Sequence, residues 1–190
     1  MKTNSIFKPA VKRLQAFSAM LVMMLCLSAP AQSKETAVAY LTKTAIDTYY
    51  TLIFDYKDTS GTNYGDMGWT GSKVLDSGET PPWEKYAESI GEVIFNRSFK
   101  SQTPKSMKNW FNGCTNLTTI QGINNLNTSQ VVDMSRAFGG CEKLTNLDLH
   151  TFDTSSLEFV RYMFDECSAL KSIDILGFKT SKIKSYDGMF

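Results

Sequence analysis

Few side chains of this 190-residue chain could do chemistry. Several of the most informative ones occupy equivalent positions in a sequence repeat. Histidine occurs once, as His150, which argues against a metal site and removes most hydrolase schemes. We therefore predict no enzyme activity, no cofactor and no metal, and expect ligand binding on an exposed strand face. The simpler interpretation is a solvated polar face without a ligand. The candidate ligand-binding residues are Thr119, Gln121, Asp148, His150 and Asp174.

Cysteine is the other reactive residue type, and its number and spacing limit its chemistry. Cys114, Cys141 and Cys167 remain once the expected leader is removed, and an odd number cannot form a complete internal disulfide framework. They are not clustered as the Cys-x-x-Cys pairs typical of zinc sites. Their regular spacing instead predicts buried thiols in one column of the core.

These residues are positioned by a repeat of about 26 residues. Phe111, Phe138, Phe164 and Phe190 follow one another at this nearly constant interval, and each of the first three is followed by a cysteine and a leucine in fixed phase. A period of this length falls in the range of leucine-rich repeats, in which one small unit stacks on the next. The predicted structural repeat core consists of Phe111, Cys114, Leu117, Phe138, Cys141, Leu144, Phe164, Cys167 and Leu170.

Within each repeat the spacing of apolar residues changes. Leu147 and Leu149 alternate with Asp148, which predicts a short strand with the aspartate pointing outward. The segment 157–164 then places apolar residues at helical spacing, which predicts an amphipathic helix of about two turns. The predicted fold is therefore an α+β solenoid, a leucine-rich-repeat-like stack of short strand–turn–helix coils with an N-terminal β cap.

Three regions are expected along the chain: a signal peptide over 1–31, an N-terminal β-rich cap region over 32–92, and repeats over 93–190. The repeats amount to about three and a half coils and stop in mid-repeat, as in a C-terminally truncated array. The region 32–92 lacks the repeat phase and is richer in Tyr, Gly and Thr.

The signal peptide is inferred from basic residues followed by an uncharged stretch over 16–27 and by the small residues Ala29 and Ala31. Lipoprotein processing at Cys26 is the alternative. Cleavage after Ala31 removes four of the 20 basic residues and none of the 19 acidic ones, which leaves a net charge of −3. That charge gives no support to nucleic-acid binding.

The expected cap region contains aromatic residues with two possible roles. Tyr50, Leu52 and Phe54 alternate with other residues, which predicts one face of a strand. Other aromatic side chains of this region would instead form a stacking platform for sugars, and a carbohydrate-binding module is accordingly the alternative function. The aromatic residues of that platform are Tyr49, Tyr64, Trp69 and Trp83.

The repeated segments 110–117, 137–149, 152–155 and 163–170 carry aromatic, cysteine, leucine and Thr-Ser positions in register. In these positions the chain resembles the BspA-like bacterial surface proteins, a branch of the leucine-rich repeat superfamily with repeats of this length. The resemblance implies an exported, non-catalytic adhesion or interaction protein that is secreted or held at the cell surface (outer membrane). It implies a protein or glycan ligand at the cell surface, with no nucleic-acid partner and no integral membrane segment after signal cleavage.

Overall fold

The computed structural model describes residues 35–43, 46–58, 68–70, 72–75 and 80–190, and the predicted signal peptide lies outside them. Strands make up most of the regular secondary structure in this part of the chain, and three of its four helical segments are 3-10 helices, marked η. In chain order the elements are β1 (Glu35–Thr42), β2 (Tyr50–Asp58), β3 (Gly68–Thr70), α1 (Ser72–Leu75), η2 (Glu84–Ser89), β4 (Ile90–Phe95), η3 (Arg97–Ser101), β5 (Thr119–Gln121), η4 (Ile123–Asn125), β6 (Asn146–Asp148) and β7 (Ser172–Asp174).

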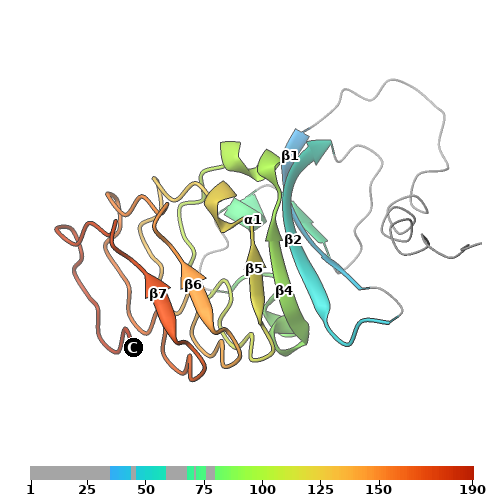
Figure 1. Ribbon diagram of the computed structural model, residues 1–190. Coiled ribbons are helices and arrows are strands. Elements are labelled where there is room, and N and C mark those ends of the chain that lie inside the picture. Colours follow the sequence, from blue (N-terminus) through green and yellow to red (C-terminus); the bar gives the residue numbers. More distant parts are fainter. Residues whose placement is uncertain (1–34, 44–45, 59–67, 71, 76–79) are drawn as a thin grey trace, which may run out of the picture. The chain divides into compact units, whose positions relative to one another are not determined.

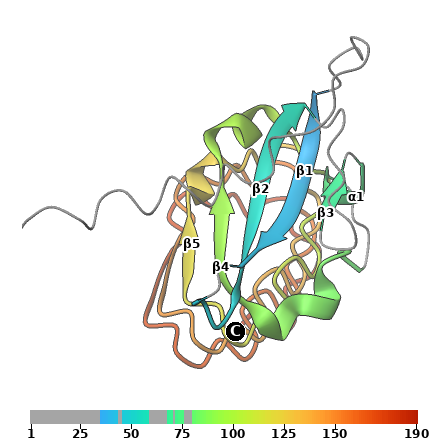
Figure 2. The ribbon, with the colours of Figure 1, turned by 90° about the vertical axis from the view of Figure 1, so that its right-hand side faces the viewer.

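The first five strands form one sheet in the order β3-β1-β2-β4-β5. β1 runs antiparallel to β2 and β3, whereas β2, β4 and β5 are parallel neighbours. Figure 2 looks onto β1, β2, β4 and β5, with the later repeats behind them. β6 and β7 form a second, parallel pair that follows β5 along the molecule (Figure 1).

An aromatic core joins the sheet to the repeats. Leu52 and Phe54 of β2 are fully buried, as expected for alternate residues of a strand with one face covered. The Phe54 ring stacks on Phe95 at 4.6 Å and on Trp110 at 5.2 Å between ring centroids. The buried Trp83 indole Nε1–H donates to the Trp110 carbonyl at 2.6 Å. The residues before and after the predicted boundary at residue 93 therefore share one core.

Consecutive repeats lie side by side, because their backbones are hydrogen-bonded at equivalent positions. The Phe111 N–H donates to the Ala137 carbonyl at 3.0 Å, and the Phe138 N–H donates to Met163 at the same distance. The phenylalanine rings pack in a column, with centroids 5.5, 5.8 and 5.4 Å apart. The successive rings of this column are Phe111, Phe138, Phe164 and Phe190.

The predicted α+β solenoid, a leucine-rich-repeat-like stack of strand–turn–helix coils with an N-terminal β cap, is wrong. The segment 157–164, where a helix was expected, forms turns and an isolated bridge. Among the described residues the one α-helix is α1, which has four residues. The described chain is instead built from small β-sheets, one of five strands and one of two, joined by turns.

The backbone conformation explains why no α-helix forms in the described repeats. Arg136 has a φ of 55°, a left-handed value that a right-handed helix does not contain. Hydrogen bonding then alternates between two patterns. The Ala137 N–H donates to Met134, three residues back, whereas the Phe138 N–H donates to Met163 in the next repeat. Successive turns thus bury apolar residues about every three positions along the sequence, which is the same spacing that predicted a helix.

Candidate functional site

The strand face (Thr119, Gln121, Asp148, His150 and Asp174) has four residues on β5, β6 and β7, and its fifth, His150, lies two residues after the end of β6. Alternation along β6 buries Leu147 and exposes Asp148, because successive side chains of a strand point to opposite sides. Thr119, Gln121 and His150 are also exposed, and Asp174 is partly buried. The structure therefore places all five predicted residues at or near the surface.

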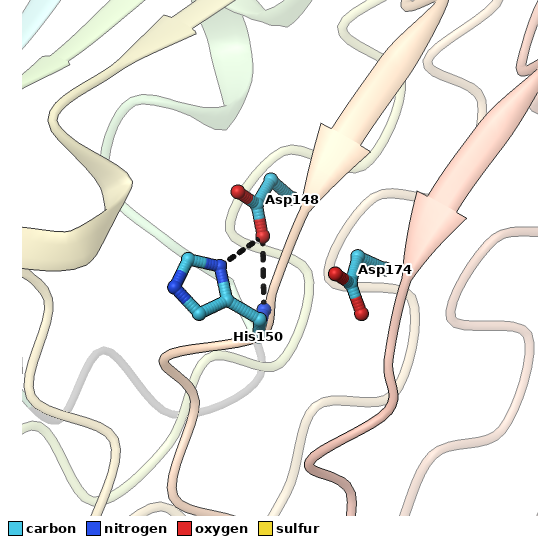
Figure 3. Close-up of side chains that lie close together, drawn as sticks. All are labelled: Asp148, His150 and Asp174. Carbon is cyan, nitrogen blue, oxygen red and sulfur yellow. Dashed lines mark hydrogen bonds and ion pairs between the residues drawn. The ribbon is translucent and has the colours of Figure 1, made fainter.

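Three of these residues come together as the Asp-His-Asp cluster (Asp148, His150 and Asp174), drawn in Figure 3. Asp148 and Asp174 are partners in the parallel register of β6 and β7. One ligand atom from each member of the cluster lies within 4.8 Å of the other two. The side chains of His150 and Asp148 are 59% and 62% exposed, so solvent reaches both.

Backbone contacts orient both carboxylates of the cluster. Asp148 Oδ1 accepts the His150 backbone N–H at 3.1 Å and the ring Nδ1–H at 2.5 Å. Asp174 Oδ1 accepts the Leu176 N–H at 3.1 Å. In each repeat the aspartate thus accepts an N–H from two residues further on, a contact that fixes its side chain without help from a ligand.

The charges in the cluster favour an ion pair. The side-chain hydrogen bond with Asp148, followed by the negative charge of that carboxylate, raises the pKa of His150 above its ordinary value of 6.5. The same side-chain hydrogen bond, with the backbone one, lowers the pKa of Asp148. Because solvent surrounds much of both side chains, this ion pair sets the local charge and contributes little to the free energy of folding.

Thr119 and Gln121 extend the strand face but lie one repeat earlier than the cluster. Thr119 is the register partner of Glu92 on β4. The Gln121 side-chain amide donates to the Glu92 carboxylate at 2.5 Å. The side-chain hydrogen bond of Gln121 is thus made to β4 and not to β6.

Two further polar residues of this surface were not singled out from the sequence. Ser172 Oγ donates to Asn146 Oδ1 at 2.8 Å, across β7 and β6. Both residues are exposed and stand in register. They lie one repeat apart in the same outward phase as the aspartates, and this spacing was the signal that could have identified them.

The cysteine column is directed inward. Cys114 and Cys141 are buried and Cys167 is partly buried, and all three are free thiols. Burial raises the pKa of Cys114 to about 12 and is the main cause of the raised pKa of Cys141. Two of the thiols donate to carbonyl groups of the preceding repeat, Cys141 to Phe111 and Cys167 to Phe138. The buried thiols of Cys114 and Cys141 are therefore protonated at neutral pH, which makes them poor nucleophiles.

The other residues of the predicted repeat core occupy the interior as well. Phe111 and Phe138 are fully buried, and Phe164 is 2% exposed. Among the leucines, Leu117 and Leu144 are buried and Leu170 is partly buried. Large apolar side chains removed from water in this way stabilise the stack of repeats.

The aromatic residues proposed for sugar stacking are separated by the fold. Trp83 is fully buried, and Trp69 is partly buried against it with a ring separation of 5.8 Å. Tyr64 lies outside the described residues. Tyr49 is 38% exposed and lines an open groove of about 420 Å³, where the Lys143 ammonium group lies 5.7 Å from its ring centroid. Of the three aromatic residues that the structure describes, Tyr49 alone has the exposure that a sugar platform needs.

A family model, described as Mycoplasma protein of unknown function, DUF285, matches residues 93–190, which are 98 of the 190 residues. The chain belongs to the DUF285 family. No curated protein and no solved structure matches the chain. The DUF285 segment contains β5, β6 and β7 and with them the whole strand face. In the part of the chain that the structure describes, no helix has the length and apolar character needed to cross a membrane.

Proposed function

We propose that this DUF285 protein is an exported, non-enzymatic interaction or adhesion protein, secreted or held at the cell surface, which binds a partner macromolecule through the strand face. The family description gives no function, so the proposal is supported by the surface itself. The finer relationship, to BspA-like surface proteins, is supported by the recurrence of phenylalanine, cysteine and leucine in the same phase of successive repeats.

The observation that carries the proposal is the row of polar side chains on β6 and β7. Asp148 and Asp174 are register partners, and the backbone between them is held by the Leu149 N–H, which donates to the Asp174 carbonyl at 2.9 Å. The neighbouring pair, Ser172 and Asn146, is joined by a hydrogen bond. Because these side chains are already ordered, a partner that binds them loses little conformational entropy.

The chemistry of the strand face indicates what the partner must offer. Carboxylates and an amide accept hydrogen bonds, so a matching partner surface carries donors such as lysine, arginine or sugar hydroxyl groups. The adjacent strands repeat the pattern at the spacing of a parallel sheet, which suits an extended ligand lying across them. A surface protein or a surface glycan meets both requirements.

The test is a binding screen of the purified protein against extracellular-matrix proteins and a glycan array. The double variant Asp148→Ala, Asp174→Ala removes both carboxylates of the strand face, and Glu142→Ala removes an exposed acidic residue outside it. We expect a ligand whose affinity falls at least about tenfold in the double variant and is unchanged in Glu142→Ala. Binding that is equal in all three proteins would exclude the strand face as the contact surface.

A carbohydrate-binding role is the second candidate, and the groove beside Tyr49 favours it. This groove is also lined by Glu92, Asn116 and Thr118, which would offer hydrogen bonds to sugar hydroxyl groups while the aromatic ring stacks on the sugar. Glycan binding that is lost in Tyr49→Ala but retained in the strand-face double variant would assign the function to this groove.

A further inference from the structure

The Asp-His-Asp cluster has the composition of a metal site as well as of a polar surface. Its ligand atoms are two carboxylate oxygens and one imidazole nitrogen, all within 4.8 Å of one another. In Figure 3 the Asp148 carboxylate, the His150 ring and the Asp174 carboxylate gather on one side of β6 and β7. Two of these residues come from adjacent strands and the third lies two residues after the end of β6, so the backbone already brings the donors together.

We propose that Asp148, His150 and Asp174 bind one divalent transition-metal ion, with Zn²⁺ as the representative ion. An imidazole with two carboxylates suits ions such as Zn²⁺, Co²⁺ and Ni²⁺, whereas Ca²⁺ and Mg²⁺ take oxygen ligands. The site needs no partner macromolecule, and it stands whether or not the strand face is a binding surface.

The distances require only small movements to reach coordination geometry. With bonds of about 2.1 Å in a tetrahedral site, two ligand atoms of one Zn²⁺ ion are about 3.4 Å apart. The ligand atoms lie within 4.8 Å of one another, so a side-chain rotation that moves the Asp174 oxygen by about 1–2 Å brings the outermost pair to that separation. The exposed side chains of Asp148 and His150 have room for the matching adjustment.

The hydrogen bond inside the cluster shows where the ion would lie. The His150 Nδ1–H donates to Asp148 Oδ1 at 2.5 Å, and a cation that replaced this proton would lie between the two atoms and move them apart to about 3.4 Å. The imidazole would then carry its remaining proton on Nε2, since a ligating nitrogen must be unprotonated. Three protein ligands on an exposed surface leave further coordination positions to solvent.

The chain offers an unusually direct measurement, because His150 is its one histidine. The NMR signals of the imidazole in the tag-free protein therefore report a single site. Titration with Zn²⁺ is expected to shift these signals until one equivalent is bound, and calorimetry should give the same stoichiometry. An excess of Ca²⁺ should leave the ring signals almost unmoved.

Variants separate the cluster from other acidic groups. Asp174→Asn and His150→Gln should each weaken Zn²⁺ binding by at least about tenfold, since each removes a ligand. Asp153→Asn is the matched control: Asp153 also accepts a hydrogen bond from the residue two positions on, Ser155, but lies outside the cluster. This control should bind Zn²⁺ like the unchanged protein. Circular dichroism establishes that each variant is folded, and His150→Gln alters an exposed side chain after the end of β6.

Three results would each overturn the proposal. The first is an imidazole spectrum that excess Zn²⁺ does not change. The second is Zn²⁺ binding that Asp174→Asn and His150→Gln leave as strong as in the unchanged protein. The third is a Co²⁺ complex with intense near-ultraviolet thiolate absorption, which would assign the ion to cysteine, most accessibly to the partly buried Cys167.

Discussion

His150 titrates beside a carboxylate, and that contact predicts how its charge depends on pH. The hydrogen bond raises the pKa of His150 and lowers that of Asp148, so the ion pair is complete between the two pKa values. It is lost as pH rises through the pKa of His150 or falls through that of Asp148. We expect NMR titration to give a pKa above 6.5 for His150 and a lower pKa in Asp148→Asn. The same pKa in both proteins would contradict the contact.

A second residue-scale prediction concerns Gly122, which has a φ of 65° at the start of η4. A Cβ added there would collide with the Phe95 carbonyl oxygen, which belongs to the backbone of β4. Gly122→Ala should lower the free energy of unfolding by about 1–2 kcal/mol for the left-handed backbone and by more for this collision.

Gly113→Ala is the matched control for Gly122→Ala. Gly113 has a φ of 73°, but its added Cβ would meet no atom closer than 3.9 Å. When both variants are compared by urea denaturation, Gly113→Ala should therefore lose only the free energy of unfolding that the left-handed backbone costs. An equal loss of stability in the two variants would mean that η4 moves away from β4 at no cost.

At the scale of elements, the periodic burial of apolar residues was predictable from the sequence, but the helices inferred from it were wrong. Val131, Met134 and Ala137 are all buried, and their spacing of three fits both a helix and a series of turns. The backbone φ separates these alternatives. Gly113 and Gly140, each directly before a cysteine, have left-handed φ values of 73° and 72° and were the available signal against a helix.

Glu166 tests the turn directly, because it stands where two earlier repeats have Gly113 and Gly140. Its φ is 58°. In a helix, Glu166→Gly would cost about 1 kcal/mol. In a left-handed turn it relieves about 1–2 kcal/mol of strain, which the greater freedom of glycine in the unfolded chain partly offsets. We expect the free energy of unfolding to stay unchanged or rise by up to about 1 kcal/mol in urea denaturation.

The control for Glu166→Gly is Glu166→Ala, which keeps a Cβ in the left-handed conformation and should bring no gain. Both substitutions remove the same charge, so the difference between them isolates the backbone effect. A loss of about 1 kcal/mol or more in Glu166→Gly would contradict the turn and favour a helix at this position.

In the candidate site, the repeat spacing predicts the position of some residues but not of others. Asp148 and Asp174 lie one repeat apart in the same outward phase, so the repeat alone indicates that they are neighbours, and the structure pairs them in register. His150 belongs to no such pair. The approach of its ring to Asp148 depends on a side-chain rotamer and on the turn after β6, which no periodicity encodes.

At the scale of the whole molecule, β4 links the N-terminal strands to the repeats. It pairs with β2 on one side and with β5 on the other, and its Phe95 packs in the aromatic core. The DUF285 match begins at residue 93, within this strand. The boundary at residue 93 thus separates the repeats from the part of the sequence without them, whereas the sheet and its core continue across it.

That shared core predicts cooperative unfolding of the sheet and the repeats. Trp83→Phe removes the indole that donates to the Trp110 carbonyl and leaves space beside Phe54, which should cost about 2–4 kcal/mol. The remaining tryptophans, Trp69 and Trp110, report the core by fluorescence, and amide hydrogen exchange at Phe138 reports the repeats.

Both measurements should show the same loss of stability in Trp83→Phe, because strand pairing through β4 and the ring column from Phe111 onward connect the two regions. Trp69→Phe, at a partly buried ring, is the control and should cost less in both measurements. Hydrogen exchange at Phe138 that stays unchanged while the fluorescence transition of Trp83→Phe moves would mean that the repeats fold without the sheet. In that case each repeat would depend only on its neighbours, and the aromatic core would stabilise the N-terminal strands alone.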